Sequence, residues 1–164
     1  MGITYLKRAT KTGEQSLSDV RELVQEILEG IQQGGDKRAL EFARKFDNYD
    51  GKIILTSEDV AEASEKVSQR IKDDIHFAYQ NVKKFAEAQK ATLNDFNVDI
   101  IPEFTAGQKY IPCNSVGCYI PGGRYSHVAS AIMTVTTAKV AGCAHIAACS
   151  PPRPDVGINP AIIY

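Results

Sequence analysis

The sequence of 164 residues contains no tryptophan, only two methionines and no long hydrophobic run. A membrane-spanning helix needs about 20 consecutive apolar residues, so we expect that the chain does not cross a membrane. No block of like charge exceeds a few residues, and the formal net charge of −1 argues against a nucleic-acid or membrane-surface partner. The N-terminal residues lack the apolar core of a signal peptide, which favours a globular protein of the cytoplasm.

Cysteine and histidine are scarce, and their spacing does not match a metal site. The four cysteines do not follow the common zinc patterns, and no two histidines stand four residues apart. We expect His76 on a solvated helix and His145 in a buried strand. Most of the cysteines lie in or beside apolar runs, where a reduced thiol behaves as a small hydrophobic group. Buried free thiols are therefore expected at Cys113, Cys118, Cys143 and Cys149.

The first part of the chain, residues 1–97, shows the periodicity of helices with charged outer faces. A helix beginning after Ser16 should stop at Gly34-Gly35, and a second helix should follow as far as about Asn48. The short apolar run 52–55 suggests a brief strand. Thr56 and the acidic residues after it should begin a third helix, and a fourth is expected over residues 69–90.

The second part, residues 98–164, changes to the pattern of strands. Two strands, 98–101 and 108–111, are expected to form a hairpin around Thr105-Ala106-Gly107. The segment 115–120 is apolar on both faces, as a strand covered by helices on both sides would be. A helix up to Ala141, ended by Gly142, should connect it to a parallel strand at 145–149, and a further helix should begin at Asn159-Pro160.

These elements predict an α/β protein in which N-terminal helices precede part of a Rossmann-like parallel sheet. The expected sheet has too few strands for a complete doubly wound core, so we expect the front part of a longer protein, prone to self-association through its uncovered surfaces.

The corner Tyr119-Ile120-Pro121-Gly122-Gly123 follows the first parallel strand, where open α/β sheets bind ligands. Glycines allow a ligand to approach the backbone, and Tyr119 offers a ring or a hydroxyl. Arg124 is a candidate for holding an anionic group, and His127 lies within reach of the same place. Pro-Gly-Gly is also a good turn without any ligand, and the segment is not the usual dinucleotide fingerprint, so both interpretations stay open.

Four segments resemble the histidinol dehydrogenase family. "SVGCYIPGGRYSHVASAIMTVTTAKVAGC" at 115–143, with "ACSPP" at 148–152, is similar to the family signature. Upstream, "GDKRALEFARKFDNYD" at 35–50 and "VKKFAEAQK" at 82–90 are similar to family segments that occur in the same order. The likeness covers the chain from about residue 16 to its end.

The resemblance implies an NAD-dependent, zinc-containing, homodimeric alcohol dehydrogenase that oxidises a small alcohol through the aldehyde to the carboxylate in two hydride transfers. By similarity, Tyr119 contacts NAD, and Pro121, Gly122 and Gly123 lie against the cofactor. The zinc ligands and the Glu-His acid/base pair of the family correspond to sequence after Tyr164. No catalytic or metal residue is therefore assigned here, and residues 1–164 alone are expected to be inactive.

The substrate suggested by the resemblance is either an amino alcohol such as histidinol or a hydroxyalkyl sulfonate such as dihydroxypropanesulfonate. Arg124-Tyr125, followed by Val-Ala-Ser-Ala, favours the sulfonate branch of the family. A different class of function also stays open, in which the chain is a truncated, non-catalytic dimerisation module.

Overall fold

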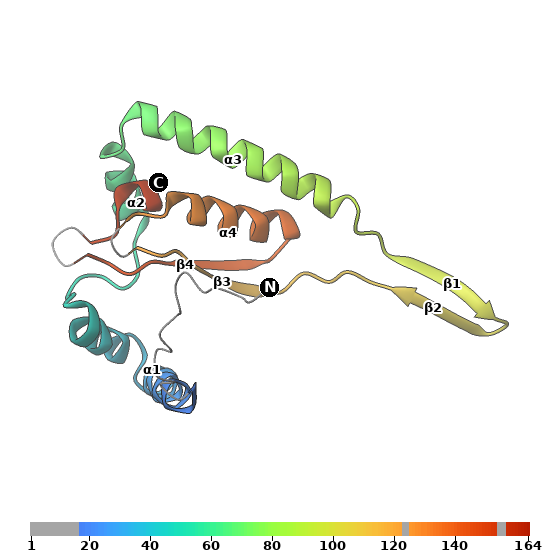
Figure 1. The fold of residues 1–164 in the computed structure, drawn as a ribbon, viewed down its shortest axis with the longest axis horizontal. Coiled ribbons are helices and arrows are strands. Elements are labelled where there is room, and N and C mark those ends of the chain that lie inside the picture. The colour runs from blue at the N-terminus through green and yellow to red at the C-terminus, as the bar shows by residue number, and fades with distance from the viewer. Residues whose placement is uncertain (1–16, 123–124, 154–156) are drawn as a thin grey trace, which may run out of the picture.

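The computed structural model describes residues 17–122, 125–153 and 157–164 (Figure 1). Helix α3 lies alongside α4, and α4 covers one face of the parallel pair β3–β4. A separate hairpin, β1–β2, extends away from the end of α3, and α1 stands apart on the other side of the parallel pair. Within the described residues, no helix is both long and apolar enough to cross a membrane.

Helix α1 (Leu17–Asp47) is bent in the middle by a glycine. Gly35 has φ 56° and ψ −147°, which is not helical, so the segment consists of two helices joined at a kink. Glycine adopts a positive φ without steric cost, whereas other residues rarely do. The predicted stop at Gly34-Gly35 is confirmed.

Helix α2 (Ser57–Glu65) begins with a reciprocal cap between Thr56 and Asp59. The Asp59 N–H donates to Thr56 Oγ1 at 3.3 Å, and the Thr56 N–H donates to Asp59 Oδ2 at 2.8 Å. Lys52 Nζ adds an ion pair to Asp59 Oδ1 at 2.7 Å. The strand suggested over 52–55 is wrong: Ile53 and Ile54 form bends, none of the four residues is in a strand, and Lys52 helps to fix the helix start.

The cap makes stability depend on pH in one direction. Hydrogen bonds from Lys52 and from the Thr56 backbone lower the pKa of Asp59 from 3.8 to about 2. The folded-state pKa lies below the unfolded one, so the stabilisation is complete above pH 3.8 and is lost as the pH falls through about 2. We expect the wild type to unfold at higher urea than Asp59→Asn near neutral pH, and this advantage to shrink at about pH 2. An advantage that stays constant with pH would contradict the assignment.

Helix α3 (Gln69–Lys90) leads into the hairpin of β1 (Phe96–Ile101) and β2 (Phe104–Gln108). Phe96 pairs with Gln108, and Ile101 pairs with Phe104. The hairpin is confirmed, but the predicted turn at 105–107 is wrong, because those residues lie within β2. The chain turns at Pro102-Glu103, where proline cannot donate to a ladder and Glu103 takes a φ of 69°.

Strand β3 (Ser115–Tyr119), helix α4 (Val128–Ala141) and strand β4 (His145–Cys149) form the predicted parallel β-α-β unit. The strands pair in register from Ser115↔His145 to Tyr119↔Cys149. Gly142 ends α4 with a φ of 97°. Lys90 Nζ at the end of α3 donates to the Val140 carbonyl at 2.8 Å, which ties the C-terminal ends of the two helices together. The chain is therefore of the α/β class.

The chain closes with helix α5 (Pro160–Ile163). The Ala161 N–H donates to the side-chain oxygen of Asn159 at 2.9 Å, which confirms the predicted start at Asn159-Pro160.

Among the described residues, only one face of the parallel pair is covered. On β3, Cys118 is buried and Val116 half-buried, and the next residue along this face, Ile120, is 1% exposed. Tyr119 and His145 are exposed. The predictions of a strand covered on both sides and of a buried His145 are wrong within the described residues, because no described element covers the second face. All four cysteines are free, but only Cys118 is buried, whereas Cys113 and Cys149 are exposed.

Candidate functional site

The carboxyl ends of β3 and β4 bring two chain corners together. Beyond the last strand residue, the Ile120 N–H still donates to the Cys149 carbonyl at 2.8 Å. The corner that leads from β3 to α4 therefore lies beside the Ser150-Pro151 corner that follows β4. Open parallel sheets bind ligands at this edge, and it is here that the sequence predicts a ligand site.

Gly122 is buried between the two corners. A Cβ atom at this position would lie 2.7 Å from the Pro151 carbonyl oxygen and 2.9 Å from Ser150 Oγ, closer than side-chain carbons approach. Glycine is thus required for the two corners to meet. This explains Gly122 structurally, before any ligand is considered.

The other predicted site residues are open to solvent. Tyr119 is 63% exposed, and Pro121 and His127 are also exposed. His127 is the N-cap of α4 but makes no capping hydrogen bond with its side chain, and the first turn of α4 contains no acidic residue. Gly123 and Arg124 lie outside the described residues.

Sequence reasoning missed Arg153, which the structure places at the same edge. Its Nη2 donates to Ser126 Oγ at 3.4 Å, linking the loop after β4 to the residues before α4. The Arg153 and Gly157 backbones exchange two hydrogen bonds of 2.9 Å. The available signal was positional: an arginine in a proline-rich segment directly after a parallel strand.

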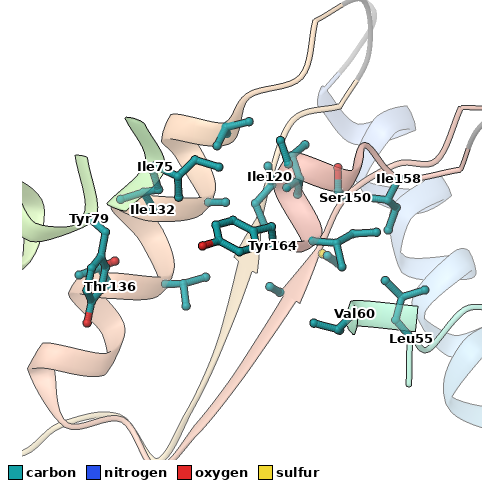
Figure 2. Close-up of a pocket in the computed structure, with 18 of the residues that line it drawn as sticks. Leu55, Val60, Ile75, Tyr79, Ile120, Ile132, Thr136, Ser150, Ile158 and Tyr164 are labelled. Carbon is teal, nitrogen blue, oxygen red and sulfur yellow. The ribbon is translucent and has the colours of Figure 1, made fainter. Parts of the chain in front are cut away.

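Behind the corner lies an apolar cleft of about 670 Å³. Figure 2 shows Tyr164 in its middle, with Ile75 of α3 and Ile132 of α4 on one side and Leu55 and Val60 on the other. Ser150 Oγ lines the cleft and is buried without a hydrogen-bond partner among the described residues. This lining is mostly apolar, although the titratable side chains of His76, Tyr79 and Lys139 also border it.

Comparison with known proteins identifies the family. The family model for histidinol dehydrogenase matches residues 10–164. The chain belongs to the histidinol dehydrogenase family. Among curated members, it is 58% identical to sulfopropanediol 3-dehydrogenase of Ruegeria pomeroyi and 47% identical to a histidinol dehydrogenase homolog of Pelagibacter ubique. Both matches cover 100% of this chain but only 38% and 39% of those proteins.

A solved structure of the family has the same fold. The crystal structure of histidinol dehydrogenase from Elizabethkingia anophelis superposes with a TM-score of 0.78 at 30% identity. The match covers 92% of this chain and 34% of that one. The chain thus spans under two-fifths of the length of the curated relatives named above.

In this member of the histidinol dehydrogenase family, the described residues hold no group of three or more His, Cys, Asp or Glu side chains that could bind a metal ion. The donor set therefore does not fit a zinc ion within these ranges, and no chemical step is assigned to zinc here.

Proposed function

We propose that this chain forms one wall of the dinucleotide site of an NAD- and zinc-dependent alcohol dehydrogenase. The observation that carries the proposal is the exposed Tyr119 at the carboxyl edge of a parallel pair, in a chain of the histidinol dehydrogenase family. NAD, when bound, accepts the hydride that the alcohol loses.

The residues at this edge fit a dinucleotide. Tyr119 presents a ring on which a flat group can stack, and the buried Gly122 lets the two corners close into one surface. The α4 N-terminus has no acidic residue to oppose the negative charge of a pyrophosphate. The nearby Ser150 hydroxyl has no hydrogen-bond partner in the described part of the chain, so it is a further polar group that a ligand could satisfy.

For the substrate, we infer a hydroxyalkyl sulfonate rather than histidinol. The 58% identity to a sulfopropanediol 3-dehydrogenase exceeds the 36% identity to the histidinol dehydrogenase of Methanococcus maripaludis. The expected reaction takes the primary alcohol to the aldehyde and then, with water, to the carboxylate. Each oxidation reduces one NAD to NADH. The first releases one proton, and the second, which consumes water and forms the carboxylate, releases two.

The test is steady-state kinetics of the protein expressed from its whole reading frame. We expect NADH formation with sulfopropanediol and none with histidinol. Tyr119→Ala should raise the KM for NAD about 10-fold, the size of one lost aromatic contact, and leave the KM for the alcohol unchanged. Residues 1–164 expressed alone should form no NADH.

Tyr110→Ala is the matched control, since Tyr110 is also exposed but lies at the base of the β1–β2 hairpin, where its N–H donates to Asp95 Oδ1. Its KM for NAD should equal that of the wild type. Equal effects of the two substitutions would contradict a role for Tyr119 in the site, and turnover of histidinol alone would contradict the substrate.

A homodimer and a cytoplasmic location stay predictions. The exposed apolar side chains of α1 and of the β1–β2 hairpin, among them Leu28, Phe96 and Ile101, support the expectation that further protein covers these surfaces.

A further inference from the structure

We propose that Arg153 binds the pyrophosphate of the dinucleotide across the carboxyl ends of β3 and β4. The inference rests on the proposed NAD site and adds to it a residue that selects for the charged part of the cofactor. Arg153 lies outside the family signature segments on which the site was first predicted.

Arg153 connects the segments that follow the two strands. Its hydrogen bond to Ser126 Oγ spans 27 residues and joins the segment after β4 to the segment after β3. The side chain therefore reaches across the edge at which both strands end. The paired backbone hydrogen bonds with Gly157, whose φ is 66°, hold the Arg153 backbone in place.

The guanidinium group retains donors for an anion. Arginine carries five N–H groups, and only one of them is used by the 3.4 Å contact with Ser126, which is longer than a typical hydrogen bond. Among the described residues, no carboxylate forms an ion pair with Arg153, whereas Arg38 and Arg44 of α1 each pair with one. Arg153 is also exposed, so an incoming ligand can reach it.

The surroundings favour a phosphate group. The backbone N–H groups at the start of α4 lie two residues beyond Ser126, and no acidic residue stands in the first turn of that helix. A guanidinium fork matches two phosphate oxygens at once, and parallel α/β sheets hold pyrophosphates at this edge. A substrate sulfonate shares this oxyanion chemistry, so the experiment has to separate the two.

The experiment is calorimetric titration of the protein from its whole reading frame with NAD, ADP and adenosine. Arg153→Ala should weaken the binding of NAD and of ADP about 10- to 100-fold, as the loss of a charge-assisted hydrogen bond does. The affinity for adenosine should not change, because adenosine lacks phosphate. Arg153→Lys should bind NAD with an affinity between those of the wild type and Arg153→Ala, because lysine keeps the charge but loses the two parallel N–H donors of the guanidinium group. Ser126→Ala should show a smaller loss in the same pattern, which provides a second variant that leaves the arginine in place.

Arg44→Ala is the control, because it removes an exposed arginine from α1. It should bind all three ligands as the wild type does. Unchanged NAD affinity in Arg153→Ala, or an equal loss of affinity for adenosine, would overturn the proposal. Arg153 would then only connect the two loops structurally. A loss confined to the KM of the sulfonate substrate would also overturn it. If the wild type binds no NAD at all, the proposed function itself fails.

Discussion

Gly122→Ala is expected to destabilise the protein by about 1–3 kcal/mol, the usual cost of forcing an extra carbon into a packed site. The added Cβ would lie 2.7 Å from the Pro151 carbonyl oxygen, and a backbone atom cannot move aside as a flexible side-chain tip can. One corner has to shift, which separates the two ends of the site. We therefore also expect weaker NAD binding. Urea unfolding gives the first quantity and calorimetric titration the second.

The same strand offers a matched control. Gly117 lies on β3, and a Cβ there would meet no atom within 4 Å. Gly117→Ala should therefore leave stability and NAD affinity close to those of the wild type. If Gly122→Ala behaves like Gly117→Ala, the corners are not closely packed against each other in solution.

Ile120→Ala is expected to cost about 2–5 kcal/mol, the range for removing a large buried aliphatic side chain. Ile120 is 1% exposed, and no other large side chain in the described ranges is so fully buried. It lies between the corner and the apolar cleft, so its loss leaves a cavity directly behind the site. The change in the free energy of unfolding, taken from urea titrations of both proteins, measures this effect.

Ile111→Ala is the comparison for that experiment. Ile111 stands shortly before β3 and is 76% exposed, so its truncation removes little buried surface. Its unfolding free energy should change by less than about 0.5 kcal/mol. Similar losses for the two variants would show that Ile120 is not the centre of the packing around the corner.

Local signals in the sequence were sufficient for the elements whose ends depend on adjacent residues. Thr56 and Asp59 begin α2, Gly142 ends α4, and Asn159 caps α5, each through contacts within a few residues. The hairpin turn was misplaced because Thr105-Ala106-Gly107 and Pro102-Glu103 both have turn composition. The pairing of Ile101 with Phe104, which decides between them, involves both strands.

The site could be predicted only in outline. Tyr119 and the corner after it could be proposed as site residues because they lie at the end of a strand that the sequence makes obvious, and this role stays a prediction. Arg153 was missed because its value depends on Ser126, which is close in space but 27 residues away along the chain. The sequence also did not predict that the described elements leave the second face of the sheet open, since apolar strand residues indicate that a face is to be covered without showing which segment covers it.

The β1–β2 hairpin shortens the effective loop that must close when α3 packs against α4 during folding. Lys90 and Val140, which join the two helices, are 50 residues apart along the sequence. The base of the hairpin is closed by the Tyr110 N–H donating to Asp95 Oδ1 at 2.8 Å. These residues are 15 positions apart, and the hairpin between them does not lengthen the loop that must close. The entropic cost of closing the loop grows only with the logarithm of the length of loop that remains. Insertions or deletions at the hairpin tip would therefore change the length of the β1–β2 hairpin and leave the packing of α3 against α4 almost unaffected.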